Sequence, residues 1–417
     1  MFAPRRLGTR QRIPTLPLLC SVVAAALSTL MTSTSAAAVV IRQSEWPLDS
    51  SHFQAETIWR ISQGQGITVA VVDSGVDAAH PDLAGQVLHG AGFLGDKQDN
   101  GQTDISSDSH GTAITGIIAG TGKANDGSGM TGLAPKAKIL PIRVSTDGSA
   151  EPTAIAEGIK YAADHHAQVI NISLGTTTPD PLLREAVNYA LNKDAVVIAS
   201  AGNEGQNGDP PMYPAAFPGV IDVTGVDTNN GFWPVSESGP RSTLAAPATD
   251  IYSTNNQGQY VNAEGTSYAA AYVSAAAALV RSAFPHLTAG QVIRRLITNA
   301  DQGHQGSKGH DDQYGYGILD PLAALRAPAA TDGGPANPLL AAHPVDTASR
   351  SSTGLVIGIS ATSALAVAAA STLLAMRRRR PSTKANAPRP TPSPSSGTRR
   401  SSKKTGGKKG KTRATRK

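Results

Sequence analysis

The sequence predicts an α/β domain with a mainly parallel sheet flanked by helices, followed by a single C-terminal transmembrane helix. Two observations lead to this prediction. Between residues 67 and 321, short runs of β-branched residues alternate with longer Ala-rich stretches of helical character, as crossover connections between parallel strands require. Nearer the C-terminus, residues 354–376 form an uncharged apolar run of about 23 residues, which is long enough to cross a bilayer as a helix.

The clearest predicted strands are short and nearly all apolar, as expected for strands that are buried on both faces. They are residues 67–72, 138–144, 169–172, 195–200 and 220–223. Two helices are expected between them, at residues 153–165 and 181–192. No internal repeat is visible, so one domain at residues 61–326 is predicted.

The N-terminus has the pattern of a secretory signal peptide at residues 1–38. Four Arg and no acidic residue precede an apolar run at residues 16–30, and small residues follow up to Ala38. An uncleaved N-terminal anchor is the alternative, but the run is short for a span. The single cysteine, Cys20, lies inside this segment, so the exported chain has no disulfide and no thiol nucleophile. Lipid attachment at Cys20 is not favoured, because two bulky leucines precede it.

The C-terminal segments divide by composition. Residues 327–353 are rich in Ala, Pro, Gly, Asp and Ser and predict a flexible linker to the span at residues 354–376. A buried helix is the alternative for that span, but the Arg block at residues 377–380 is typical of the cytoplasmic end of a transmembrane helix. The tail at residues 377–417 is expected to be disordered and cytoplasmic.

Charge is distributed unevenly along the chain. The tail holds 16 of the 37 Lys and Arg residues and no acidic residue, whereas the exported part holds 17 basic against 31 acidic residues. Attraction of the tail to anionic lipid is the favoured interpretation. Nucleic-acid binding by the tail is a weaker alternative, because no aromatic residue lies among its charges.

Two polar residues are expected at the carboxyl edge of the predicted sheet, where ligands bind in open α/β folds. Asp73 ends the hydrophobic run Val-Ala-Val-Val, and His110 precedes a helix-like stretch at residues 113–119. Taken singly, each has an ordinary explanation: many folds end a strand in Asp, and a lone histidine at such a place is more often a cap or a surface residue.

Two further motifs follow in the same domain. Asn203 comes after a buried strand in the run Ser-Ala-Gly-Asn-Glu-Gly, and Ser267 lies in Gly-Thr-Ser-Tyr-Ala-Ala at the start of an Ala-rich helix. The ordinary explanations are an Asn-containing turn and an N-cap serine. A serine in a first helical turn, however, also has a free backbone N–H and the positive end of the helix dipole beside it.

The four residues together meet the requirements of acyl transfer. A serine hydroxyl becomes nucleophilic when a neutral imidazole takes its proton, and a carboxylate holds the imidazole in the right tautomer. The predicted catalytic residues are therefore Asp73, His110 and Ser267, with the Asn203 side chain and the Ser267 N–H as oxyanion donors. No cofactor is implied, and no convincing calcium or other metal site is visible.

The order and surroundings of these motifs resemble the subtilisin family of serine proteases over about residues 57–325. The resemblance implies a subtilisin-like sheet and a polypeptide substrate. It also implies that Ser173, Leu174, Gly175 and Gly202 bind that substrate, with main-chain hydrogen bonds to an edge. Two positions depart from the family pattern: Ala113 stands where His is common and Ala271 where Pro is usual.

Within the family, the chain is most similar to the mycosins, membrane-anchored subtilisins linked to type VII secretion. The similarity lies in the signal peptide, the single C-terminal span and a short lead-in containing Trp46 and Trp59. Residues 39–60 are too few for a folded pro-domain and are expected to pack along the catalytic domain. The expected function is an extracytoplasmic, membrane-anchored serine endopeptidase, with a type VII secretion complex as a possible partner. The alternative is a catalytically idle subtilisin-fold scaffold subunit of such a complex.

Overall fold

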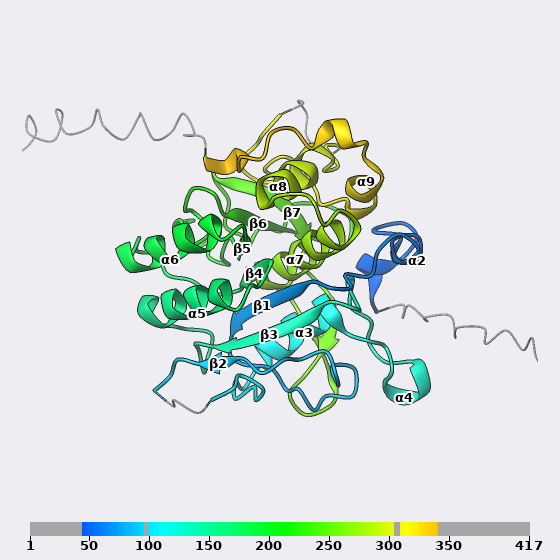
Figure 1. The fold of residues 1–417 in the computed structure, drawn as a ribbon, viewed down its shortest axis with the longest axis vertical. Helices are drawn as coiled ribbons and strands as arrows, with labels where there is room; N and C mark the ends of the chain where they lie inside the picture. Colours follow the sequence, from blue (N-terminus) through cyan, green and yellow to red (C-terminus); the bar gives the residue numbers. More distant parts are fainter. Residues whose placement is uncertain (1–43, 96–98, 304–308, 341–417) are drawn as a thin grey trace, which may run out of the picture. The chain divides into compact units, whose positions relative to one another are not determined.

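The computed structural model describes residues 44–95, 99–303 and 309–340, and its centre is a seven-stranded sheet (Figure 1). The strands are β1 (Thr68–Asp73), β2 (Ala91–Gly92), β3 (Lys138–Arg143), β4 (Val169–Ile172), β5 (Val196–Ser200), β6 (Ile221–Val226) and β7 (Ser242–Pro247). Their order is β2-β3-β1-β4-β5-β6-β7, and every neighbouring pair is parallel. A separate antiparallel hairpin joins β8 (Ile251–Thr254) to β9 (Tyr260–Ala263).

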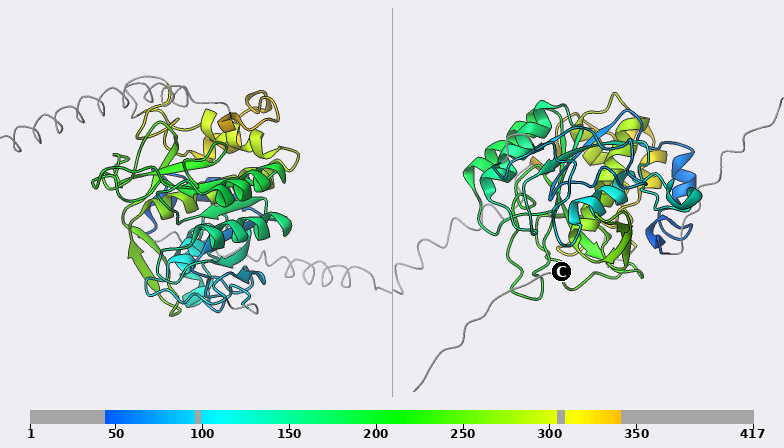
Figure 2. Two further views of the ribbon diagram at one scale, coloured as in Figure 1. Left: turned by 90° about the vertical axis from the view of Figure 1, so that its left-hand side faces the viewer. Right: turned by 90° about the horizontal axis from the view of Figure 1, so that it is seen from below.

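Helices cover both faces of this sheet (Figures 1 and 2). They are α2 (Ala55–Trp59), α3 (His110–Ala119), α4 (Ala124–Gly127), α5 (Pro152–Asp164), α6 (Pro181–Asn192), α7 (Thr266–Ala283), α8 (Ala289–Thr298) and α9 (Pro321–Arg326). Three short 3-10 turns complete the described elements: η1 (Trp46–Leu48), η2 (Ala329–Thr331) and η3 (Pro338–Leu340).

The alternation of side chains along the strands divides the interior into two cores. In β1, Val69 and Val71 face a core shared with α3 and α7, whereas Ala70 and Val72 face a core shared with α5 and α6. Both sets are fully buried, which explains why the strands of this sheet read as continuous apolar runs. The predicted α/β class with a mainly parallel sheet is therefore confirmed.

Helix α7 runs through the middle of one of these cores. Of its 18 residues, the 16 from Thr266 to Arg281 are buried, and seven of these are alanines. Small side chains let the helix lie close against the strands, and a helix that is apolar all round belongs inside a domain. Its first turn is thereby held firmly beside the carboxyl ends of the central strands.

Several elements differ from the sequence prediction. β2 and β7 were not expected: β2 has only two residues, and β7 contains Ser, Thr and Pro. α8 was also missed, although Thr288 and Gln291 form a capping box at its start. The first part of the expected linker packs onto the domain, because Arg295 pairs with Asp332 and Leu339 is buried.

The N-terminal segment also packs onto the described domain. The Glu45 carboxylate accepts from Thr131 N at 2.7 Å, and the Trp59 indole donates to Leu133 O at 2.9 Å. Among the residues that the structure describes, no helix is both long enough and apolar enough to cross a membrane. The predicted signal peptide, span and basic tail lie outside the described residues.

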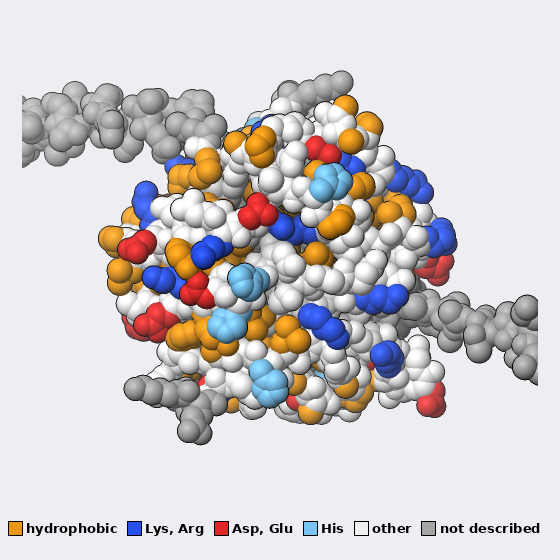
Figure 3. All heavy atoms as spheres, in the orientation of Figure 1, with side chains coloured by type: hydrophobic (Ala, Val, Ile, Leu, Met, Phe, Trp, Pro, Cys, Tyr) orange, Lys and Arg blue, Asp and Glu red, His pale blue; other side chains and the backbone are white. Residues whose placement is uncertain are grey.

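Charges of both signs mix on the surface of the described domain. On the face drawn in Figure 3, acidic and basic side chains are interspersed.

Candidate active site

The structure brings Asp73 and His110 into direct contact. Asp73 is the last residue of β1 and is 1% exposed, and His110 is the first residue of α3. The imidazole Nδ1 lies 2.8 Å from Asp73 Oδ1 and 3.0 Å from Oδ2. Because a carboxylate only accepts, Nδ1 carries the proton in this pair, and Nε2 is the nitrogen left to act as a base.

The electrostatic surroundings favour the protonated form of His110. Burial by itself would lower the pKa of the imidazole, because it penalises the charged form. The carboxylate of Asp73, which also accepts its hydrogen bond, and the charges of Asp108 and Asp104 outweigh burial and raise the pKa of His110 to about 9. His110 therefore becomes a neutral base under alkaline conditions.

Ser267 lies in the first turn of α7, next to a residue that touches His110. The N-cap is Gly265, so the Ser267 hydroxyl does not cap the helix, and it donates to Ser173 O at 3.1 Å. The ring of Tyr268 lies 5.9 Å from the His110 ring, measured between centroids. The Ser267 hydroxyl is thus bonded to Ser173 O and not to His110 Nε2, and it must exchange that acceptor before it can pass its proton to the imidazole.

Asn203 is held by the same helix start. Its Oδ1 accepts from Thr266 N and from Thr266 Oγ1, both at 3.0 Å. This fixes the amide so that Nδ2 is the atom that can donate elsewhere, and a Cβ at Gly265 would lie 3.6 Å from Nδ2. The backbone N–H of Ser267 belongs to the same turn. Two donors are thus available near the nucleophile, as an oxyanion hole requires.

The residues expected to bind substrate lie at the same edge of the sheet. Ser173 follows β4, and its Oγ donates to Ser267 O at 3.3 Å. Leu174 is buried, and a Cβ at Gly175 would collide with the carbonyl of Tyr213, so only glycine fits that position. On the other side, Gly202 N donates to Thr266 Oγ1 at 3.2 Å.

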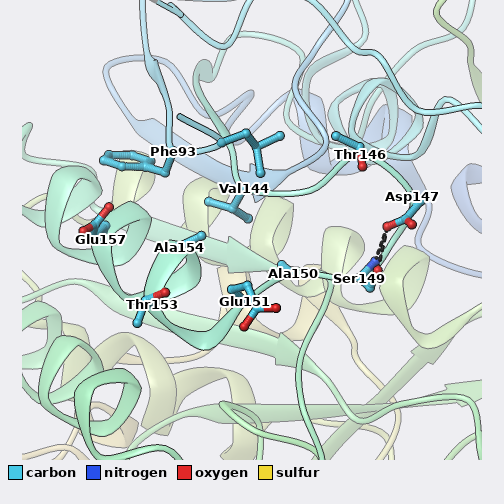
Figure 4. Close-up of a pocket in the computed structure, with 11 residues that line it drawn as sticks. Phe93, Val144, Thr146, Asp147, Ser149, Ala150, Glu151, Thr153, Ala154 and Glu157 are labelled. Carbon is cyan, nitrogen blue, oxygen red and sulfur yellow. Dashed lines mark hydrogen bonds between the residues drawn. The ribbon is translucent and has the colours of Figure 1, made fainter. Parts of the chain in front are cut away.

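A groove of about 510 Å³ is lined by residues that follow β3 and by the first turns of α5 (Figure 4). One wall includes Val144, whose N–H donates to Asp73 O at 2.8 Å. Phe93 and Ala154 supply apolar surface, whereas the lining also carries three acidic residues, Asp147, Glu151 and Glu157. Asp147 accepts from Ser149, which shapes the turn at the rim. The groove can therefore receive side chains that are apolar or basic.

Sequence reasoning missed two buried acids near the oxyanion turn. Glu237 and Asp222 are 2% and 8% exposed, and burial is the main reason that the pKa of each rises to about 7. The missed signal was Glu237 itself, an acid within the run Val-Ser-Glu-Ser-Gly between two strands. In the described ranges, no group of three or more His, Cys, Asp or Glu side chains could hold a metal ion.

Comparisons with known proteins agree with this geometry. The model of the subtilase family, Peptidase S8, matches residues 64–317. Thermitase from Thermoactinomyces vulgaris is 43% identical over 230 residues, covering 55% of this chain and 80% of thermitase. Fervidolysin from Fervidobacterium pennivorans is 36% identical, covering 67% of this chain but only 43% of the longer relative.

Solved structures give the same result. MycP1 from Mycobacterium smegmatis superposes with a TM-score of 0.61 at 30% identity, covering 72% of this chain and 88% of MycP1. MycP3, described as a protease from the type VII (ESX-3) secretion system, has a TM-score of 0.56 at 36% identity, covering 66% of this chain and 86% of MycP3.

Proposed function

Because this chain belongs to the subtilase family and is a subtilisin-like serine endopeptidase, we propose that Asp73, His110 and Ser267 form its catalytic triad. The observation that carries the assignment is the contact of the His110 Nδ1 with both Asp73 oxygens, at 2.8 and 3.0 Å. That contact fixes the tautomer in which Nε2 faces away from the carboxylate and can accept a proton.

The reaction proceeds through an acyl-enzyme. His110 Nε2 takes the hydroxyl proton of Ser267 as its oxygen attacks the scissile carbonyl, and Asp73 stabilises the imidazolium. The tetrahedral oxyanion accepts hydrogen bonds from Ser267 N and Asn203 Nδ2. The imidazolium then protonates the leaving amine, and a water molecule activated by the same nitrogen hydrolyses the ester.

The substrate is a polypeptide that adds to the domain as an extended strand. Residues 173–175 offer it main-chain hydrogen bonds on one side of the cleavage site, and Gly202 lies on the opposite side. The groove lined by Val144, Asp147 and Glu151 is the proposed site for a substrate side chain upstream of the cleaved bond. No metal or cofactor takes part in this mechanism.

The protease is anchored to the cell membrane as a single-pass protein, with its catalytic domain outside and its basic tail in the cytoplasm. The charge-free run at residues 354–376 and the following Arg block support this topology. The partner is a type VII secretion membrane complex, which the descriptions of the similar MycP1 and MycP3 structures support. Anionic lipid is the expected partner of the tail, and nucleic acid is not.

A serine-directed fluorophosphonate tests the catalytic assignment. It should label the purified protein at Ser267 and should fail to label the Ser267→Ala variant. By analogy with subtilisin, loss of the nucleophile should lower kcat about a millionfold. A folded protein that resists the reagent would instead support the idle scaffold, and turnover that survives Ser267→Ala would refute the triad.

Membrane topology needs a separate test. In intact spheroplasts, an added protease should reach the catalytic domain but leave an epitope fused after Lys417 undigested. Digestion of that epitope without lysis would contradict the proposed orientation.

A further inference from the structure

The first turn of α3 is held by side chains that lie outside the helix. Its N-cap, Ser109, has a left-handed backbone with φ 62° and makes no side-chain cap. The first three N–H groups of a helix have no helical acceptor and need other partners. Here the N–H groups of the first three residues are accepted in order, at 3.2, 3.0 and 3.0 Å, by Ser106 Oγ, Ser74 Oγ and Asp104 Oδ2.

Asp104 connects all three acceptors. Its Oδ1 accepts from Ser74 Oγ at 2.9 Å, from Ser106 Oγ at 2.7 Å and from Ser106 N at 3.0 Å. Its Oδ2 accepts from Thr112 N at 3.0 Å and from Thr112 Oγ1 at 2.7 Å. The residue is 7% exposed, so these five donors are what compensates a buried carboxylate for lost hydration.

The position of these donors in the chain gives the network its meaning. Ser74 directly follows Asp73 at the end of β1, and its hydroxyl also accepts from Gly111, the residue after His110. One carboxylate therefore ties the strand end that carries the acid to the helix turn that carries the base. We propose that Asp104 is a positioning residue of the triad, which sets the separation and angle between Asp73 and His110.

The packing around the network leaves little room for adjustment. A Cβ at Gly111 would collide with the carbonyl of Gly75, so helix and strand approach as closely as backbones can. On the outer side, Asn256 Nδ2 donates to Asp104 O at 3.2 Å and to Ser106 O at 2.8 Å. The loop is thus fixed from two directions, and a changed side chain at residue 104 must displace α3 rather than be absorbed by the loop.

Asp104 also acts on His110 through its charge, and this effect must be separated from positioning. The charged or polar groups that face the imidazole are Asp73, Asp104, Asp108 and the ring of Tyr268. Asp108 is exposed and raises the pKa of His110 through its charge. Asp108→Asn is therefore a matched control for Asp104→Asn, because each removes one negative charge near the same ring.

The experiment compares kcat and kcat/KM of both variants with the parent between pH 6 and pH 10. Both should move the acidic limb of the kcat/KM profile to lower pH, because each removes a charge that favours imidazolium. Only Asp104→Asn should lower kcat on the alkaline plateau, on the order of ten- to a hundredfold, with KM little changed. Equal plateaus for the two variants would overturn the proposal.

A readout without turnover separates this inference from the proposed function on which it rests. In a Ser267→Ala background, the proton shared by His110 Nδ1 and Asp73 gives a far-downfield 1H NMR resonance. Asp104→Asn should shift or broaden this resonance. Asp108→Asn should leave the resonance unaltered at a pH below the acidic limb of the kcat/KM profile, where His110 is protonated in every variant. An unchanged resonance in Asp104→Asn refutes positioning, whatever the activity assays show.

The milder variant Ser74→Ala covers the case in which Asp104→Asn does not fold. It removes only the hydroxyl that links Asp104 to Gly111 N, and it should lower the kcat plateau by a smaller factor than Asp104→Asn. If both fold, the double variant should lose less than the product of the two single losses. Ser74→Ala with an unaltered kcat plateau and an unaltered resonance would contradict the network's role.

Discussion

Glu237 gives the sharpest prediction about the stability of this fold. It is 2% exposed and lies directly behind the oxyanion turn, where a Cβ added to Gly202 would collide with its carboxyl group. Neither carboxylate oxygen has a hydrogen-bond partner, and the Glu204 N–H favours the ionised form without reaching hydrogen-bond geometry. Burial, followed by the charges of Asp209, Asp222 and Glu204, raises the pKa of Glu237 from 4.5 to about 7.

The sign of the effect follows from linkage. The unfolded chain releases this proton near its ordinary pKa of 4.5, whereas the folded protein keeps it until about 7. The folded state therefore binds more protons in this interval, and its stability falls as the pH rises through it. Between pH 5 and pH 8 this single group should remove about 2 to 3 kcal/mol of the free energy of unfolding.

The substitution Glu237→Gln makes the side chain neutral at every pH and should abolish this contribution. Thermal unfolding is measured for Ser267→Ala and for the double variant, because loss of the nucleophile prevents self-digestion. Between pH 5 and pH 8, the Tm of the Ser267→Ala protein, which is the parent in this comparison, should fall by roughly 5 °C more than the Tm of the double variant with Glu237→Gln. Glu185→Gln, at an exposed site on α6, is the control and should follow the parent. Parallel curves for Glu237→Gln and the parent would refute the reasoning.

Three further predictions concern catalysis and the oxyanion turn. Asn203→Ala should lower kcat a hundredfold or more with KM little changed, because it removes one oxyanion donor. A rise in KM alone, measured by steady-state kinetics, would contradict that role. The kcat/KM of the parent should fall as the pH drops below about 9, since His110 then becomes protonated and cannot accept the proton of Ser267. If kcat/KM instead falls only below about pH 6.5, the surrounding carboxylates do not raise the pKa of His110. Gly202→Ala should abolish folding or labelling by a fluorophosphonate, because φ at residue 202 is +117° and the new Cβ would meet Glu237. The control is Gly208→Ala, which also has a positive φ, of +101°, but lies in open space and should remain folded and active.

The pattern of the sequence predicted the central sheet well and its edges poorly. β4 (residues 169–172) and α6 (residues 181–192) match their predicted bounds, because buried strands and amphipathic helices leave a strong periodic signal. β2 and β7 have no such signal, since one has two residues and the other is defined by its pairing with β6. Their assignment depends on a neighbouring strand that the local sequence does not specify.

The candidate site shows the same division between chemistry and contacts. The order Asp73, His110, Asn203, Ser267 led to the proposed reactive groups, because acyl transfer demands those residue types. The sequence did not reveal that Asp104 joins the elements that carry the first two. A buried carboxylate with five donors is indistinguishable, in a sequence, from an aspartate in a surface turn, since its partners come from residues up to 30 positions away.

The described helices begin in two ways, with or without a side-chain cap. α6, α8 and α9 start with side chains that cap their N–H groups, namely Asp180, Thr288 and Asp320. α3 and α7, the helices that carry His110 and Ser267, start with no such cap, and neither do α2, α4 and α5.

At α7 the missing cap leaves a donor for the reaction. Thr266 N is taken by Asn203 Oδ1 and Tyr268 N by Gly265 O, so the N–H of Ser267 between them can serve an oxyanion. A serine or aspartate at residue 265 would compete for the N–H groups of that turn, but its side chain would be strained in this backbone conformation. Gly265, at φ +154°, has no side chain with which to compete. The first turn of α7 thus has no side-chain cap and keeps a positive helix end open beside the proposed nucleophile.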